Sequence, residues 1–532
     1  MSKQLTWLKS TKQWTRWKID YLAIFILMAF YYGQLQWPPY IGDPDGFYHA
    51  KIALWLRQGK LLTTLPWVQF TTLKDHFTDH HLLYHLLLAP FTLISNPLMG
   101  VKIATVVFTV TMVLVFYWLL KKIHVVWPWI FTLLFITLNG LNFRLSLIKA
   151  NSLSLLVIFL LLYALFKQKK WLMALLGFIF IWLYGGWPLA ILITLIYLIT
   201  DNVYNYYHSN RLKLLWHKVI RVFTHQPNES KNIKLLVWLL LGLLAGLIIN
   251  PYWPQNLYFY YQQIIQIGII NLGNQFPVGG EWYGTDLITL ISAVPHIFVT
   301  NCLIFILLIF RHKKISRQTW FSFALMFIFL LLTIKSRRYV EYFMPFALLF
   351  TACGITDLKK ITNWEKIVKI WQGLRLYLKI YLIVALLAFA TLVMPTVIRS
   401  TIDTQIPQHL PFDKFQLATN WLKNNTPENS IIFHSDWDEW PILFYHNDHN
   451  YYLVGLDPTF MHNFDARLHQ RFIDLSTGQI IHNPARQIKD AFGAEFIFVE
   501  KNNHTMLIQN LDNDLYASLV YEDSDTRIYK IN

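Results

Sequence analysis

The chain has 532 residues, of which 55% are hydrophobic and only 14% charged, and its mean hydropathy is +0.36. This composition excludes an ordinary soluble enzyme, a disordered chain and a disulfide-stabilised scaffold. The formal net charge is +16, but up to residue 397 there are 36 Lys and Arg against 12 Asp and Glu, and beyond it 10 against 18. A basic membrane part is thus followed by an acidic tail, and we interpret the charge as membrane topology, with no nucleic-acid partner.

Apolar runs recur along the first 400 positions, and each is long enough to cross about 30 Å of hydrocarbon. They predict eleven membrane spans, at residues 21–37, 98–119, 125–141, 152–166, 171–184, 187–200, 235–250, 286–309, 320–334, 340–356 and 378–397. The shorter apolar stretch 82–94 is expected to be a re-entrant or interfacial helix.

The distribution of Lys and Arg among the loops predicts the orientation. Alternate loops are rich in Lys and Arg, and together with the basic N-terminus they are expected to be cytoplasmic. We therefore predict a multi-pass protein of the cell membrane with a membrane domain at 1–397 and large outer loops at 38–97 and 251–285. Residues 398–532 are then extracytoplasmic, and turns between short β-like runs such as 430–433 and 495–499 predict a mixed α/β domain there.

The first outer loop carries an unusual set of acidic and histidine side chains. Asp43 and Asp45 are followed later by Asp79, His80 and His81. Carboxylate oxygens and imidazoles bind divalent cations, and either group can act as a base. A hydrated loop that caps its helices with Asp is the alternative.

The second large outer loop contains Glu281 within the run Gly279-Gly280-Glu281-Trp282-Tyr283-Gly284. Glycines permit movement, so the loop is a candidate lid that brings its one carboxylate to a substrate. A flexible connector with a solvated Glu281 is equally compatible with this segment.

Arg337 and Arg338 lie at the predicted outer end of a span, against the usual bias of positive charge. An Arg at such an edge can bind a lipid phosphate through charge-assisted hydrogen bonds. The alternatives are snorkelling to the interface or pairing with Glu341.

These segments resemble, in order, the catalytic subunits of oligosaccharyltransferases, which belong to the GT-C membrane glycosyltransferases. Asp45-Gly46-Phe47-Tyr48-His49-Ala50 resembles the first acidic motif of that family, and Glu281 its loop glutamate. The segment from Arg338 to Pro345 is similar to the family's phosphate-binding motif. The tail run from Trp421 to Glu428, followed by Trp437-Asp438, resembles the approach to the acceptor motif.

The resemblance implies a GT-C fold of about 11 to 13 membrane helices and a transferase that uses a polyprenyl phosphate or pyrophosphate sugar as donor. Asp45 would bind a divalent cation (Mg or Mn) or orient the acceptor, with Asp79, His80 and His81 as further possible metal ligands. Arg338 and Arg337 would hold donor phosphate, Glu281 would close the site, and Trp437 and Asp438 would contact a protein, lipid or glycan acceptor.

Two departures from the family pattern leave alternatives open. The acceptor motif is replaced by Asp436-Trp437-Asp438-Glu439-Trp440, and the loop 142–152 has Arg144 and Lys149 but no carboxylate. Arg144 and Lys149 could therefore neutralise phosphate without a metal. Transfer of a single sugar to a lipid, glycan or protein hydroxyl is the second reading, and a transporter or flippase embedded among membrane lipids is the third.

Overall fold

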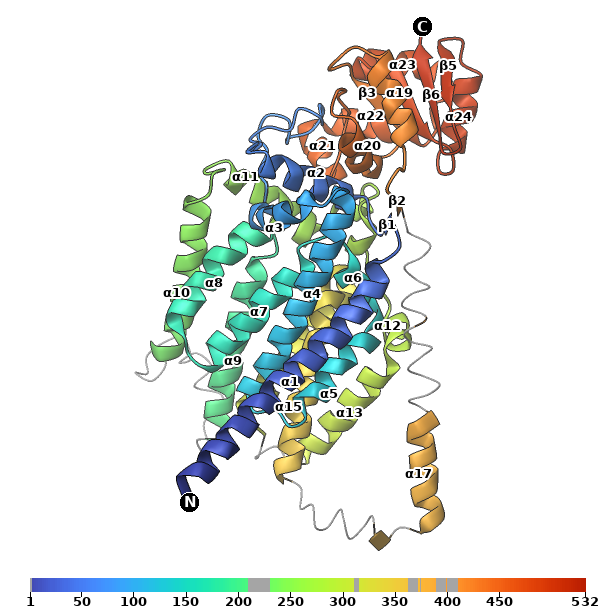
Figure 1. The fold of residues 1–532 in the computed structure, drawn as a ribbon. Helices are drawn as coiled ribbons and strands as arrows, with labels where there is room; N and C mark the ends of the chain where they lie inside the picture. Colours follow the sequence, from blue (N-terminus) through green and yellow to red (C-terminus); the bar gives the residue numbers. More distant parts are fainter. Residues whose placement is uncertain are drawn as a thin grey trace.

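Long helices form a bundle, and the tail lies at one end of it (Figure 1). The computed structural model describes residues 2–208, 230–310, 315–361, 372–373, 375–388, 399 and 410–532. The long helices of the bundle are α1 (Ser2–Gln36), α4 (Pro97–Lys122), α7 (Asn151–Phe166), α8 (Lys170–Leu183), α9 (Pro188–His208), α10 (Ser230–Ile248), α13 (Pro295–Ile309), α14 (Arg317–Lys335) and α15 (Val340–Ile361). A further helix, α17 (Leu376–Ala388), stands apart from them in Figure 1.

Most of the predicted spans have a helix in the expected place. In the described residues, four helices are long and apolar enough to cross a membrane alone, or six if each of two bent pairs is one span. The predicted span 286–309 is not straight, because α12 (Leu287–Ala293) and α13 meet at 101°. Pro295 opens α13 and has no N–H to continue the preceding helix, which accounts for the break. Part of the predicted span 378–397 lies outside the described residues.

The region predicted as a span at 125–141 is divided among short helices. They are α5 (Pro128–Leu133), η2 (Leu134–Thr137) and the start of α6 (Asn139–Ser146). α6 meets α7 at 115°. The bend leaves residues 147–150 as a non-helical connection, and this connection carries Lys149 into the region described below.

Small residues allow close helix packing in the bundle. A Cβ on Gly242 of α10 would lie 1.9 Å from the carbonyl oxygen of Ala174 in α8, and one on Gly177 would lie 2.7 Å from the carbonyl oxygen of Leu239. In lipid there is no hydrophobic driving force between helices, so close packing of their backbones is a main source of helix association. The α8–α10 pair thus depends on these glycines.

Short elements cover the tail-side end of the bundle. They are β1 (Tyr40–Ile41), α2 (Asp45–Arg57), α3 (Leu82–Leu88), η1 (Ala89–Leu93), α11 (Asn256–Tyr260), the π-helix η4 (Tyr261–Ile270), η5 (Leu272–Asn274), η6 (Gly280–Trp282) and η8 (Arg337–Tyr339). The stretch 82–94 is short and helical, as predicted, and α3 lies beside α2 near the tail (Figure 1).

The tail is a mixed α/β domain around a four-stranded sheet of order β3-β4-β6-β5. β3 (Ile432–His434) and β4 (Phe496–Glu500) are parallel and pair Ile432 with Phe496, at the two runs predicted as strands. β6 (Thr526–Ile531) and β5 (Ala517–Glu522) complete the sheet in antiparallel pairing. The surrounding helices are α19 (Gln416–Asn425), η11 (Trp437–Glu439), α20 (Trp440–His446), α21 (Pro458–Phe464), α22 (Ala466–Ser476), α23 (Pro484–Phe492) and α24 (Thr505–Asp512).

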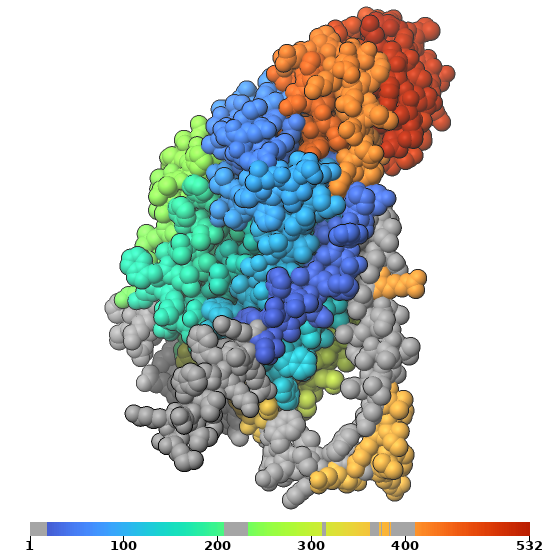
Figure 2. Space-filling model, in the orientation of Figure 1, coloured from blue at the N-terminus to red at the C-terminus, as the bar shows by residue number. Residues whose placement is uncertain are grey.

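The tail is joined to the loop at residues 38–97 through the backbone. β1 pairs with β2 (Leu410–Pro411), and the N–H groups of Gln69 and Phe70 donate to the carbonyls of Tyr452 and Leu453 at 2.9 and 3.0 Å. Figure 2 shows the tail atoms in continuous contact with those of this loop. The tail therefore packs directly against this loop and covers the end of the bundle there.

Candidate functional site

The N-terminus of α2 presents two carboxylates to a lysine. The Asp45 N–H donates to Oδ1 of Asp43 at 2.9 Å, a short-range bond that starts the helix. A Cβ on Gly46 would lie 3.1 Å from Cδ1 of Ile148, so this turn packs tightly against the connection between α6 and α7. Lys149 Nζ consequently reaches Asp43 at 2.9 Å and Asp45 at 2.8 Å. Burial raises the pKa of the Asp45 carboxyl, and the charge of Lys149 opposes this effect.

A second group of charges is centred on Glu281. Arg338 Nη1 donates to Oε1 of Glu281 at 2.8 Å, and Arg144 binds the other carboxylate oxygen. Arg338 Nη2 also donates to the Tyr184 hydroxyl at 2.7 Å. Burial by itself would raise the pKa of Glu281, but Arg144, Arg338 and Lys149 outweigh it and hold that pKa below its usual range.

Backbone contacts fix the loop that carries Glu281. The Ser336 hydroxyl donates to the Glu281 carbonyl at 2.9 Å, and the Arg337 N–H donates to the Tyr283 carbonyl at 2.9 Å. Arg144 Nε donates to Glu341 at 3.0 Å. Glu341 therefore pairs with Arg144, and Arg338 pairs with Glu281 and not with Glu341. The loop is thus closed onto the end of α14 in this conformation.

Histidines form the wall next to α2 and α3. His49 Nδ1 lies 2.7 Å from His85 Nε2, and His85 Nδ1 lies 2.7 Å from Oδ2 of Asp79. The rings of His80 and His81 lie 3.8 Å apart between centroids. Burial lowers the pKa of His80 to about 3 and that of His81 well below its usual value, so both rings are neutral.

These groups surround a cavity of about 100 Å³ beneath the tail. The helical domain and its loops contribute Asp45, Tyr48, His49, Phe77, Thr78, His80, His81, Lys149, Asn151, Tyr184, Phe259, Gln263, Glu281, Trp282 and Arg338. The tail contributes Leu456, Asp457 and Phe460. Burial raises the pKa of Asp457 to about 6, although the Thr459 N–H donates to its side chain at 2.8 Å.

Gly185 allows one wall of this cavity to form. A Cβ at this position would lie 3.0 Å from Cδ2 of His80, so the turn between α8 and α9 passes close beside that ring. The segment Tyr184–Pro188 forms this turn, because α8 ends at Leu183 and α9 begins at Pro188. It also brings the Tyr184 hydroxyl to Arg338.

The structure brings together most of the residues predicted for the site. Asp45, Glu281, Arg338, His80 and His81 all line the cavity. Asp79 lies outside the lining, where His85 binds it. Arg337 is exposed and donates to the Gly284 carbonyl at 3.1 Å, so it lies away from the cavity.

The predicted acceptor residues Trp437 and Asp438 lie beside the cavity and do not line it. Trp437 approaches the Glu281 loop, since a Cβ on Gly279 would be 3.9 Å from its Cη2 atom. Burial, followed by the carboxylates of Asp436, Glu439, Glu500 and Asp43, raises the pKa of Asp438. Trp437 and Asp438 are therefore near both the loop that carries Glu281 and the segment that carries Asp43.

The donor groups do not fit a divalent cation in the described part of the chain. There, no three His, Cys, Asp or Glu side chains converge as ligands of one ion. Asp43 and Asp45 both face Lys149, and Asp79 faces His85. Binding of Mg or Mn stays a prediction, and the arrangement favours its alternative, in which basic side chains face the phosphate.

Several cavity residues carry no recognisable motif. Tyr184, Gln263, Asp457 and Phe460 reach the cavity from three different segments. The sequence could have indicated Gln263, because the pair Gln262-Gln263 is polar within an otherwise apolar stretch. Nothing local distinguishes Asp457 from other helix-capping aspartates.

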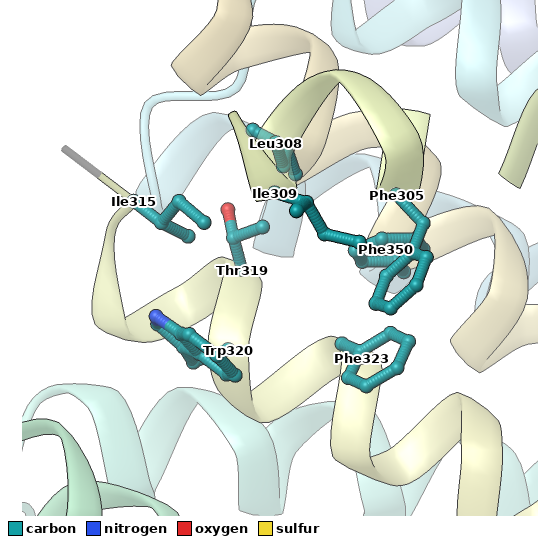
Figure 3. Close-up of a pocket in the computed structure, with 8 residues that line it drawn as sticks. All are labelled: Phe305, Leu308, Ile309, Ile315, Thr319, Trp320, Phe323 and Phe350. Atoms are coloured by element: carbon teal, nitrogen blue, oxygen red, sulfur yellow. The ribbon is translucent and has the colours of Figure 1, made fainter. Parts of the chain in front are cut away.

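A larger cavity of about 290 Å³ lies elsewhere, between α13, α14 and α15 (Figure 3). Its described wall is almost entirely apolar and includes Phe305, Leu308, Phe323 and Phe350, with Thr319 as the one hydroxyl among the described lining residues. None of these described residues is an acid, a base or a phosphate-binding cation. The smaller, charged cavity is therefore the candidate active site.

The chain is similar in structure to three kinds of solved membrane glycosyltransferase. The Archaeoglobus fulgidus oligosaccharyltransferase in the apo form matches with a TM-score of 0.61 and 11% identity, over 96% of this chain and 74% of that one. ArnT from Cupriavidus metallidurans, bound to undecaprenyl phosphate, matches with 0.51 and 12%, over 97% and 98%. The mycobacterial arabinofuranosyltransferase AftD matches with 0.51 and 12%, over 97% of this chain and 40% of that one.

No protein-family model and no curated protein sequence matches the chain. The structural matches show that the chain has the GT-C fold of multi-pass membrane glycosyltransferases. At these identities they establish the fold and leave donor and acceptor to be argued from the site.

Proposed function

We propose that the protein is a membrane glycosyltransferase that transfers a sugar or oligosaccharide from a polyprenyl phosphate donor to an acceptor on the extracytoplasmic face. The observation that carries the proposal is the cavity in which Lys149 and Arg338 lie with Asp45 and Glu281 beneath the tail. Among the matching structures, ArnT is bound to undecaprenyl phosphate, and an archaeal oligosaccharyltransferase is in complex with an inhibitory peptide and a dolichol-phosphate.

Charge favours a donor with one phosphate over a pyrophosphate. Three cations form two neighbouring groups of ion pairs with four carboxylates: Lys149 pairs with Asp43 and Asp45, and Arg144 and Arg338 pair with Glu281 and Glu341. The two groups together therefore already sum to one negative charge. A pyrophosphate would add more negative charge than a monophosphate, at a site of low dielectric constant where repulsion is costly.

Phosphate binding would exchange partners within this network. The Arg338 partner Glu281 has a second cationic partner in Arg144, so a donor phosphate can replace Glu281 at Nη1 while Arg144 keeps Glu281 paired. As the bond between the sugar and the phosphate breaks, negative charge grows on the phosphate oxygen. Preoriented Lys149 and Arg338 then stabilise the transition state more than the ground state.

The altered tail motif bears on the acceptor. Asp436 and Glu439 bind each other's backbone as a capping box at η11, which makes part of this run structural. Trp437 and Asp438 are left to face an acceptor beside the Glu281 loop. This favours transfer of a single sugar to a lipid, glycan or protein hydroxyl over recognition of a peptide sequon.

The test is mass spectrometry of lipid-linked sugars incubated with purified protein. Polyprenyl monophosphate and pyrophosphate donors are compared for wild type, Asp45→Asn and a chelator-treated sample. We expect turnover of a monophosphate donor, its loss in Asp45→Asn and its persistence with the chelator. Turnover that the chelator abolishes would restore the metal prediction, and a broad donor panel left untouched by wild type would overturn the proposed function.

A further inference from the structure

The row Asp79–His85–His49 ends in the cavity and has no part in holding the donor phosphate. Asp79 is 3% exposed, His85 0% and His49 3%, so the whole row is shielded from bulk water. Both links in the row are 2.7 Å long. These distances are those of strong hydrogen bonds between neighbouring polar groups.

The protons in the row are assigned from its carboxylate end, because the role of each ring nitrogen depends on the tautomer. An ionised Asp79 only accepts hydrogen bonds, so His85 Nδ1 must carry the proton that it donates to Oδ2. In the His85 tautomer that carries its one proton on Nδ1, Nε2 has the lone pair and His49 Nδ1 donates to it. The remaining nitrogen of His49, Nε2, consequently carries a lone pair.

This lone pair is available to a ligand. Within the described ranges Nε2 of His49 makes no hydrogen bond. It is also not one of the fully buried polar atoms that lack a hydrogen-bond partner, so it is accessible from the cavity that His49 lines. His49 lies one helical turn after Asp45 on α2, and the two side chains therefore reach the same cavity. Asp45 is already engaged by Lys149, whereas His49 Nε2 is not engaged.

We propose that His49 is the general base that takes the proton from the acceptor, and that His85 and Asp79 are positioning residues that hold its tautomer. The inference rests on the proposed function. As the acceptor oxygen forms its bond to the anomeric carbon, the bond from that carbon to the phosphate oxygen breaks. The acceptor proton moves to His49 Nε2, and the leaving polyprenyl phosphate keeps the electron pair.

The surroundings of His49 keep it ready for this role. Burial, and after it the neighbouring groups His85, Lys149 and His80, lower the pKa of His49 well below its usual value. His81 and Tyr84 also contact its ring, at 5.3 Å between centroids in each case. Neutral His49 can accept a proton at physiological pH, and the charge that it then gains is held by the row that ends at Asp79.

The test compares His49→Gln and Asp79→Asn in the full-length protein. Asn at position 79 can donate to His85, which would reverse both tautomers and place a proton on His49 Nε2. We expect kcat to fall about 10²- to 10⁴-fold in both variants, the range of general-base catalysis. The KM for the donor and the binding of polyprenyl phosphate without sugar should change little. If His49 and Asp79 had a purely structural role, their substitution would change the KM, this binding and the thermal stability together.

His76→Gln is the matched control, because His76 is an exposed histidine of the same loop. If wild type turns over a donor and folded His49→Gln does so with undiminished kcat, the inference is overturned and the proposed function stands. If His49→Gln does not fold, normal kcat in Asp79→Asn has the same consequence. Failure of wild type on every donor would instead count against the proposed function itself.

Discussion

Single residues in this protein act through partners that are distant in sequence. Arg338 pairs with Glu281 and Tyr184, and Lys149 separates two carboxylates that would otherwise repel each other. Each of these charges is partly buried, so its partner decides both its orientation and its protonation.

Lys149→Met tests the phosphate role of the lysine. Loss of one preoriented cation should lower donor turnover by about 10²-fold or more, because the charge developing on the phosphate loses a stabilising partner. Turnover is measured by mass spectrometry, with Lys423→Met, at an exposed lysine of the tail, as the control. Unchanged turnover in Lys149→Met would exclude this role.

Asp457→Asn tests the buried carboxyl of the cavity roof. Folding raises the pKa of Asp457 from 3.8 to about 6, so the folded state binds the proton more tightly than the unfolded state does. Native stability is therefore lost as pH rises from about 4 to 6, by up to about 3 kcal/mol, and the Asn variant avoids this loss. Thermal unfolding should show a higher midpoint for the variant at pH 7 and convergence near pH 4. An equal difference at both pH values would contradict this explanation.

Among the helices, packing depends on specific small residues and on breaks. The α8–α10 contact needs Gly242, and the break before α7 delivers Lys149 to the cavity. The apolar runs predicted where most helices lie, but bends of 115° and 101° arise from how the pieces pack against each other and from Pro295.

Gly242→Leu should separate α8 from α10. The added side chain would start 1.9 Å from a backbone oxygen that cannot rotate away, and overpacking costs about 1–3 kcal/mol or more. We expect a lower thermal midpoint in detergent. Gly33→Leu is the matched control, because a Cβ on Gly33 of α1 meets nothing within 4 Å. Equal midpoints for the two variants would show that this approach is not limiting.

At the scale of the whole molecule, the tail completes the cavity. Phe460 stacks on Phe259 with ring centroids 5.8 Å apart, and Asn463 exchanges hydrogen bonds of 2.6 and 3.3 Å with Gln266. The ring contact joins α21 to α11, and the hydrogen bonds join it to the π-helix η4, a helix type that is rare and often found at functional sites.

Asn463→Ala tests this joint between the tail and the loop. Removing the amide leaves Gln266 without its partner and should cost about 1–3 kcal/mol at the contact. We expect a higher KM for the donor and faster proteolysis of the tail, with the tail fold itself retained. Asn513→Ala, on an exposed turn of the tail, should change neither measurement. A donor KM equal to that of wild type would show that the tail does not help to close the cavity.

The sequence by itself determined the membrane helices, the α/β tail with its first two strands, and Asp45, Glu281 and Arg338 as residues of the site. These features depend on local hydrophobic runs and short motifs, which are readable without knowledge of distant contacts. Only the tertiary structure decided that Glu341 pairs with Arg144, that Lys149 takes the place between Asp43 and Asp45, and that His85 connects His49 to Asp79. Such pairings join residues 6 to 197 positions apart, and they follow from helix bends and side-chain packing that no local pattern specifies.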